Sequence, residues 1–362
     1  MLADRSNIPQ TFLHFFNTDP QHMILGREGL VSFSLGPRVI MDNKPERFLH
    51  GPAAVVAPNG DWLVAYQNGL DDPGRDSFIS QMRSRDQGRT WAQDGIVYDE
   101  RDKRVGSRNP TFGLTGNGKI ILVVQRASPD EKLPHPESLL NSTYCLSSDN
   151  GKSYGFMGYA DVSRPRGHFG SSSHILLRDG LLYMVAYSLD GIVLYVSDDN
   201  AESWRRRSLV FQPSEFHEDP YYPTIVFRPD GSLLCQCHLD RAMENYQKVS
   251  EDNGFTWTEW KPANIRLRHP VLAYVEDVLI AVGRLMPVRL RAGFYMSADH
   301  GDTWTGPFDL APDLPNGGGG YTAVIPLGDR VFVVFSYCIP PARDTYLQAN
   351  SILGVTLSNV SM

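Results

Sequence analysis

The chain has 362 residues, of which 41% are hydrophobic and 11% aromatic, so a disordered chain is excluded and a large apolar core is expected. The formal net charge of −7 opposes binding to a phosphate backbone, and we expect no nucleic-acid partner. No apolar run approaches the roughly 18 residues of a transmembrane helix, so we expect no membrane partner.

The start of the chain and its cysteines bear on the compartment. The opening residues, MLADRSNIPQTFLHFF, lack the basic start and continuous apolar run of a signal peptide. We expect a cytoplasmic protein, or a secreted one whose leader has been removed. Four cysteines are too few for a disulfide scaffold, and we expect reduced thiols in the core.

Two repeats run along the chain. Six segments have a turn followed by an apolar β-run: 60–66, 118–124, 180–186, 231–237, 277–282 and 328–334. Five segments follow the pattern Ser-x-Asp-x-Gly-x-Thr-Trp with small changes: 84–91, 147–154, 197–204, 250–257 and 297–304. In the second pattern the Asp accepts backbone N–H bonds across a turn, and the Gly supplies a positive φ. Their Asp residues are 63, 50, 53 and 47 positions apart, a spacing typical of four-stranded propeller blades.

These repeats predict an all-β fold, a six-bladed β-propeller with four-stranded antiparallel blades, formed as a single domain over residues 1–362. The N-terminal run Gly29–Leu35 and the C-terminal run 351–357 are expected to pair in one blade and to close the ring. The turn pattern resembles the Asp-box (BNR repeat) of the sialidase, or neuraminidase, superfamily, and this resemblance covers nearly the whole chain.

Candidate site residues come from the strands nearest the axis. The starts of these strands converge at one mouth of a propeller, and the hairpin ends add further side chains. The starts contain His50-Gly51-Pro52, Arg108-Asn109-Pro110, Ser173-His174, Tyr221-Tyr222-Pro223, Arg268-His269-Pro270 and Gly320-Tyr321; the hairpin ends contain Gln67, Arg126, Tyr187, His238, Arg284 and Tyr337. Together they predict a polar, titratable pocket on the axis.

The resemblance to sialidases assigns roles to several of these positions. It implies that Tyr321 is the tyrosine nucleophile and that Arg284 is one of the arginines that bind the substrate carboxylate. His50 and His238 stand where the family has two other such arginines, and Tyr222 stands where it has the glutamate that activates the nucleophile. The family's general acid, an aspartate, falls in the loop 68–76, which contains the following candidates: Asp71, Asp72 and Asp76. Because histidine lacks the two-pronged guanidinium fork, the sequence departs from the family at the carboxylate site.

Three functions stay open from the sequence. The first is a glycosidase in which Tyr321 attacks the anomeric carbon and Asp72 or Asp76 protonates the leaving oxygen. The second is a polysaccharide lyase acting on a uronic acid, with acid–base and charge-neutralising roles for His50, His238, His269, Tyr222 and Tyr321. The third is a non-catalytic sugar-binding propeller.

The expected partner is a glycan or a small acidic sugar. The residues expected to bind it are Arg108, Arg284, Arg126, His269, Tyr221 and His174. No His, Cys or Asp set has a metal-ligand spacing, and we expect neither a metal nor a cofactor. Each histidine, taken singly, could instead be a hydrogen-bonded structural residue. The Asp-boxes are expected to be structural turns.

Overall fold

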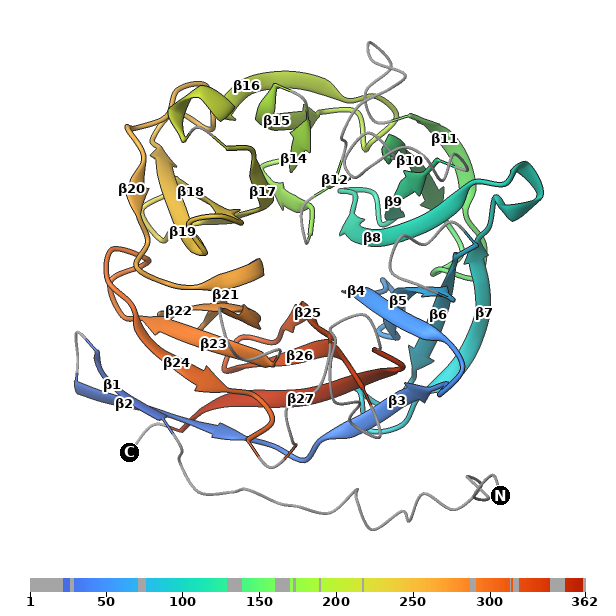
Figure 1. The fold of residues 1–362 in the computed structure, drawn as a ribbon, viewed down its shortest axis with the longest axis horizontal. Coiled ribbons are helices and arrows are strands. Elements are labelled where there is room, and N and C mark those ends of the chain that lie inside the picture. Colours follow the sequence, from blue (N-terminus) through green and yellow to red (C-terminus); the bar gives the residue numbers. More distant parts are fainter. Residues whose placement is uncertain are drawn as a thin grey trace.

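Six antiparallel sheets surround a central axis (Figure 1). The computed structural model describes residues 22–26, 29–70, 76–128, 139–159, 170–171, 174–188, 190–216, 218–286, 291–312, 314, 319–338 and 349–360. The sheets form the six blades of a β-propeller, so the predicted fold is confirmed. The first strand of each blade borders the axis, and the later strands lie progressively further out.

Blades 1 to 3 follow the chain in order. Blade 1 comprises β4 (Phe48–Val56), β5 (Trp62–Gly69), β6 (Phe78–Ser84) and β7 (Ala92–Tyr98). Blade 2 comprises β8 (Gly106–Leu114), β9 (Ile120–Ala127), β10 (Leu139–Ser147) and β11 (Gly155–Tyr159). In blade 3 the inner edge is formed by β12 (Gly170–Ser171) and β13 (Leu176–Arg178), followed by β14 (Leu181–Ser188), β15 (Gly191–Ser197) and β16 (Arg205–Phe211).

Blades 4 to 6 complete the ring. Blade 4 comprises β17 (Pro220–Phe227), β18 (Leu233–Leu239), β19 (Glu244–Ser250) and β20 (Lys261–Pro262). Blade 5 comprises β21 (Leu267–Val275), β22 (Val278–Leu285), β23 (Ala292–Ser297) and β24 (Thr305–Asp309). Blade 6 begins with β25 (Gly319–Pro326), β26 (Arg330–Tyr337) and β27 (Ser351–Val360).

The two ends of the chain close blade 6 together. Strand β2 (Gly29–Leu35) pairs with the second half of β27, from Ser32 opposite Val360 to Leu35 opposite Leu357. This confirms that the two terminal segments share one blade, but β2 reaches only Leu357 of the predicted run 351–357. The sequence analysis missed β3 (Val39–Asn43), which pairs with the first half of β27, and β1 (His22–Gly26), which extends the sheet beyond β2. Because the outer strands of blade 6 come from the N-terminus, this blade has no turn between its third and fourth strands, and five Asp-boxes serve six blades.

The Asp-boxes are turns between the third and fourth strands of a blade. In the copy that follows β23, the Asp299 carboxylate accepts hydrogen bonds from Ser297 Oγ at 2.8 Å and from Thr303 N at 2.8 Å. The Thr303 hydroxyl donates to the same carboxylate at 2.6 Å. Gly301 has φ +97°, and a Cβ there would lie 2.7 Å from the Leu234 side chain of the preceding blade. Each turn thus also packs one blade against its neighbour.

The core consists of apolar layers between adjacent blades. Within the described residues, six buried clusters each join two neighbouring blades, and one of them unites Val64 and Tyr66 of blade 1 with Phe332 and Val334 of blade 6. All four cysteines are buried and unbridged, as expected. Among the described residues, no helix has the length and hydropathy to cross a bilayer.

Candidate active site on the propeller axis

A repeated backbone irregularity directs side chains towards the axis. In five blades the pairing of the inner strand with the second strand shifts at equivalent places. Each shift contains a residue with positive φ: Gly51 (+54°), Asn109 (+39°), Tyr222 (+50°), His269 (+57°) and Gly320 (+82°). A bulky side chain rarely adopts this conformation, and such strain concentrates at functional sites. Among these five shifts, Tyr222 and His269 are the two positions that retain a large polar side chain at a backbone cost.

The pairs that flank these shifts are equivalent from blade to blade. Four inner-strand residues lie opposite second-strand residues as follows: His50 with Gln67, Arg108 with Gln125, Tyr221 with His238, and Arg268 with Arg284. In blades 3 and 6 the second-strand positions are Tyr187 and Tyr337. The sequence analysis placed Arg126 in this set. The register instead places Gln125 there, and because side chains alternate along a strand, Arg126 faces the other way.

The centre of the site is a pair of tyrosines from blades 4 and 6. The Tyr321 hydroxyl donates to the Tyr222 hydroxyl at 3.1 Å. The His269 ring stacks on Tyr321 with ring centroids 4.5 Å apart, and the His50 ring lies 4.0 Å from Tyr321. The Arg284 guanidinium lies over the same ring, 4.5 Å from its centroid. The structure thus brings together four predicted catalytic or binding residues around Tyr321.

Arginines make this centre electropositive. Arg284 Nη2 lies 3.5 Å from His50 Nε2, and Arg268 donates to the Tyr222 hydroxyl at 3.4 Å. Burial, reinforced by the charges of Arg284 and Arg108, holds the pKa of His50 well below its ordinary value. Burial and the charge of Arg284 lower the pKa of His269 to about 4. Both imidazoles are therefore neutral at neutral pH, and each can accept a proton.

A carboxylate links the tyrosine pair to the next residues of blade 4. Asp240 Oδ2 forms an ion pair with Arg268 Nη2 at 3.1 Å. The other carboxylate oxygen of Asp240 lies 3.2 Å from Nε2 of the fully buried His238. Burial raises the pKa of Tyr222, and the charge of Arg268 opposes this effect. His238 thus belongs to an Asp240–Arg268 network beside the tyrosine pair. The sequence analysis assigned no role to Arg268 or Asp240.

A chain of amides positions a third tyrosine. The Asn109 amide donates to Gln125 Oε1 at 3.0 Å, and Gln125 Nε2 donates to the Tyr187 hydroxyl at 2.8 Å. The Tyr187 ring in turn contacts Tyr221 and Tyr222, with ring centroids 5.6 and 6.1 Å apart. The sequence analysis named Asn109 and Tyr187 but not Gln125, and the bond from Gln125 to Tyr187 depends on the packing of blade 2 against blade 3.

Three further candidates, Arg126, His174 and Asp76, have partners outside the group around Tyr321. The Arg126 guanidinium pairs with Glu100 at 2.6 Å and stacks on Tyr159. His174 Nε2 lies 3.0 Å from the Ile225 carbonyl oxygen. Asp76 accepts a hydrogen bond from the Leu70 backbone N–H at 3.0 Å. Asp71 and Asp72 lie outside the described residues.

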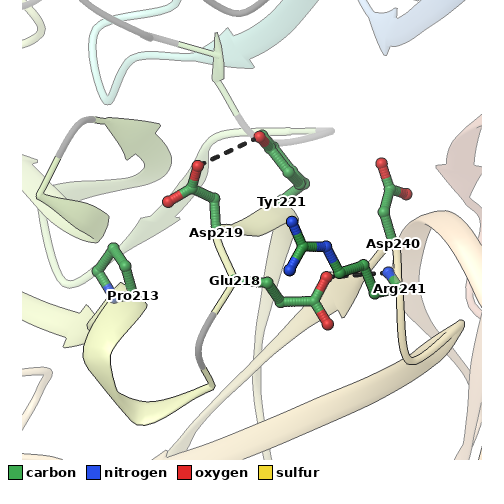
Figure 2. Close-up of a pocket in the computed structure, with 6 residues that line it drawn as sticks. All are labelled: Pro213, Glu218, Asp219, Tyr221, Asp240 and Arg241. Carbon is green, nitrogen blue, oxygen red and sulfur yellow. Dashed lines mark hydrogen bonds between the residues drawn. The ribbon is translucent and has the colours of Figure 1, made fainter.

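A pocket of about 490 Å³ opens beside this centre on blade 4 (Figure 2). Its lining consists of Pro213, Glu218, Asp219, Tyr221, Asp240 and Arg241. Tyr221 and Asp240 therefore belong to the pocket wall and also contact the residues of the axial centre. In the part of the chain that the structure describes, no group of three or more His, Cys, Asp or Glu residues has the arrangement of a metal site.

Comparison with known proteins gives one family match and several distant relatives. Residues 60–333 match the family described as BNR repeat-like domain. A sialidase of Micromonospora viridifaciens is 24% identical over 57% of this chain and 35% of its own length. A sialidase of Clostridium perfringens is 25% identical over 54% of this chain and 56% of its own length. The chain therefore spans between a third and somewhat over half of the length of these curated relatives.

Solved structures share the fold at low identity. A Dyadobacter fermentans protein of unknown function has a TM-score of 0.69 at 18% identity, covering 89% of this chain and 97% of that one. An α-L-arabinanase of Penicillium chrysogenum, solved with arabinobiose, has a TM-score of 0.64 at 16% identity with the same coverages.

Proposed function

The chain belongs to the family of BNR repeat-like domains, and from this premise we propose that it is a glycoside hydrolase that releases a sialic acid or a related acidic sugar from glycans. Both curated relatives are sialidases, and the arabinanase of similar fold binds a sugar in its crystal. These relatives support the reaction class. The acidic character of the sugar is proposed from the charge of the axial centre.

The observation that carries the proposal is the hydrogen bond between Tyr321 and Tyr222 beside Arg284 and Arg268. A phenol is a suitable nucleophile when the substrate has its own carboxylate next to the anomeric carbon, because an anionic nucleophile would be repelled. The guanidinium groups provide positive charge both for that carboxylate and for the oxygen that becomes negative as Tyr321 loses its proton.

The proposed reaction has two steps. The Tyr321 oxygen attacks the anomeric carbon while the bond to the leaving oxygen breaks, and that oxygen takes a proton from an aspartic acid, either Asp76 or Asp72. In the second step the aspartate takes a proton from a water molecule as that water attacks the same carbon, and the Tyr321 oxygen leaves and takes back the proton that it lost in the first step. Because the partner of Tyr321 is the neutral Tyr222 and not a carboxylate, the proton of Tyr321 passes to His50 or His269, the two neutral imidazoles in ring contact with it.

A second candidate reaction is β-elimination on a uronic acid. The neutral His50 and His269 favour it, because such a reaction needs a base for the C5 proton. In this reaction the base removes that proton, a C4–C5 double bond forms, the C4–O bond breaks and a tyrosine protonates the leaving oxygen. The arginines neutralise the charge that builds up on the substrate carboxylate.

One experiment separates the two reactions and tests both. The protein is incubated with aryl sialosides and with uronate-containing glycans, and free reducing sugar and the absorbance of unsaturated uronates are followed together. Sugar release without the absorbance, lost in Tyr321→Phe, supports the hydrolase. A rise in absorbance supports elimination. Binding of the acids without turnover contradicts both reactions and leaves a sugar-binding propeller.

A further inference from the structure

We propose that Asp240, in the turn after β18, is a positioning residue of the axial centre, which holds Arg268 against the Tyr222 hydroxyl and so orients the tyrosine pair for the reaction. This inference rests on the proposed function, because the step that it supports is the attack by Tyr321. It adds a carboxylate that acts on the two tyrosines through Arg268.

One nitrogen of Arg268 serves both Asp240 and Tyr222. The Nη2 atom donates to Asp240 Oδ2 at 3.1 Å and to the Tyr222 hydroxyl at 3.4 Å. The two hydrogens of this nitrogen lie in the plane of the guanidinium and point in fixed directions. When Asp240 accepts one of them, the other is therefore directed at Tyr222.

The Tyr222 hydroxyl receives two hydrogen bonds. Arg268 donates one of them, and the Tyr321 hydroxyl donates the other at 3.1 Å. Both bonds use lone pairs of the same phenolic oxygen, so the direction from which Arg268 approaches limits the direction that is left for Tyr321. Asp240 thus acts on the orientation of the nucleophile through two successive hydrogen bonds.

Arg268 has a neighbour of like charge. It lies directly opposite Arg284 in the pairing of β21 with β22, and like charges in such a pair repel each other. The Arg284 guanidinium lies over the Tyr321 ring, whereas that of Arg268 lies over the Tyr222 ring, 5.5 Å from its centroid. Asp240 comes from blade 4, as Tyr222 does, and its negative charge offsets this repulsion on the side where Arg268 has to lie.

The turn that carries Asp240 is itself held in place. Oδ1 of Asp240 lies 3.2 Å from Nε2 of the fully buried His238. The next two residues, Arg241 and Ala242, donate their backbone N–H groups to the Glu218 carboxylate at 2.9 and 3.3 Å, and Figure 2 shows the first of these bonds. Such support is what the precise placement of a functional side chain requires.

The charge of Asp240 gives its role a kinetic signature. Because it is a carboxylate beside Arg268, it opposes the binding of an acidic sugar. Its removal should therefore lower kcat, since the tyrosine pair loses its orientation, while KM stays the same or falls. A purely structural ion pair between blades gives a different result, because a loosened site binds the substrate less tightly and KM rises.

The test compares variants of Asp240 on whichever aryl sialoside or uronate-containing glycan the wild type hydrolyses. Asp240→Asn keeps an oxygen that can accept from Arg268, and Asp240→Ala removes it. Asp240→Ala is also combined with Tyr222→Phe. Steady-state kinetics gives kcat and KM, and urea denaturation measures the stability of each variant.

The matched control is Glu244→Gln. Glu244 of blade 4 also forms an ion pair at 3.1 Å with an arginine beside the first strand of blade 5, Arg266. The exposure of its side chain, 35% against 39% for Asp240, is similar. This variant therefore removes an equivalent charge and an equivalent link between the two blades, but at a place without contact to the tyrosine pair.

We expect kcat to fall about tenfold in Asp240→Ala and about threefold in Asp240→Asn, with KM unchanged or lower in both. In the Tyr222→Phe background the loss from Asp240→Ala should shrink to about twofold or less, because effects that act through one group are not additive. Glu244→Gln should change neither constant.

Three results would overturn the inference and leave the proposed function in place: an unchanged kcat in Asp240→Ala, a raised KM that accompanies a loss of stability, or an equal loss of kcat in the Tyr222→Phe background. A wild type that hydrolyses none of the acidic glycosides would overturn the proposed function and this inference together.

Discussion

The Tyr321 hydroxyl donates a hydrogen bond to the Tyr222 hydroxyl at 3.1 Å. The bond joins blade 6 to blade 4, although blade 5 lies between these two blades in the ring. The resemblance to sialidases places Tyr222 at the position of the glutamate that activates the nucleophile. A phenol does not ionise near neutral pH, and burial raises the pKa of Tyr222 further. In the proposed reaction Tyr222 therefore orients Tyr321, and a different base takes the proton of Tyr321. We propose His50 or His269 for this role, because both rings contact Tyr321.

The substitution Tyr222→Phe tests this division of roles. It removes the hydroxyl and keeps the ring that contacts Tyr187, His269 and Tyr321. We expect kcat to fall about 10- to 100-fold with little change in KM, because positioning of the reacting group is lost while substrate binding is kept. Steady-state kinetics measures kcat and KM on whichever of the aryl sialosides or uronate-containing glycans proves to be the substrate. An unchanged kcat would contradict a role of Tyr222 in the reaction. The control is Tyr246→Phe, which removes a hydroxyl on β19, the third strand of blade 4.

The substitution Arg284→Lys tests carboxylate binding. Lysine keeps the positive charge but loses the planar fork that grips a carboxylate through two hydrogen bonds. We expect the Kd of an acidic sugar to rise about 10- to 100-fold, and the Kd of its methyl ester to change much less. Arg205→Lys on the outer strand β16 is the control, because Arg205 pairs with the exposed Asp198. Equal losses for acid and ester would indicate a packing role for Arg284.

The fold was predictable because its signals are local. Each Asp-box is a self-contained turn of eight residues, and its recurrence counts the blades without any knowledge of long-range contacts. The missing sixth copy follows from the closure of blade 6 by N-terminal strands. Strand β3 (Val39–Asn43) went unnoticed because it is short and it contains a Met, an Asp and an Asn among its residues, so only its pairing with β27 defines it.

The site was predictable only as a set of positions. The starts of the inner strands identified His50, Tyr222, His269 and Tyr321, which the structure brings into contact. The choice between Gln125 and Arg126 depends on a register, and a shift of one residue exchanges the inward and outward faces of a strand. The links from Arg268 to Asp240 and from Gln125 to Tyr187 join residues whose positions in sequence give no sign of contact.

The substitution Asp299→Ala tests the structural role of an Asp-box. It removes three hydrogen bonds within the turn after β23. We expect the free energy of unfolding to fall by about 2 kcal/mol, at roughly 1 kcal/mol for each bond with a discount for partial exposure. KM and kcat should stay unchanged, because the turn lies between the third and fourth strands of blade 5, away from the axis. Urea denaturation with parallel kinetics measures both; an altered KM would contradict a purely structural role.

Acid should destabilise the protein through its buried histidines. The pKa of His269 is about 4 in the folded protein, against about 6.5 in an unfolded chain. Between these values the unfolded chain binds more protons, so stability is complete above about pH 6.5 and is lost as the pH falls towards 4. In His269→Asn, whose Asn tolerates a positive φ, this loss should be smaller by up to about 3 kcal/mol. Urea denaturation between pH 7 and 4 measures the difference, and identical pH dependence in the variant would contradict it.

The substitution Arg126→Met decides between a binding role and a structural one for Arg126. Burial raises the pKa of Glu100, but hydrogen bonds from Arg126 and Lys103 outweigh burial and hold this pKa below its ordinary value. The Arg126–Glu100 pair therefore stabilises the fold at pH values above the pKa of Glu100 in the unfolded chain, about 4.3. This contribution is lost as the pH falls through the lower pKa that Glu100 has in the folded protein. Methionine leaves the Glu100 carboxylate buried and short of its main partner.

We expect Arg126→Met to lower the free energy of unfolding by about 2 to 3 kcal/mol at pH 7, less than for a fully buried pair because both side chains retain some exposure. The deficit should shrink below about pH 4, where Glu100 becomes neutral in the variant. Denaturant titrations at pH 7 and pH 3.5 measure this, with Arg205→Met as an exposed-pair control. The Kd for acidic sugars should not change, since the Arg126 guanidinium faces Glu100. A large rise in that Kd without loss of stability would restore Arg126 to the binding site.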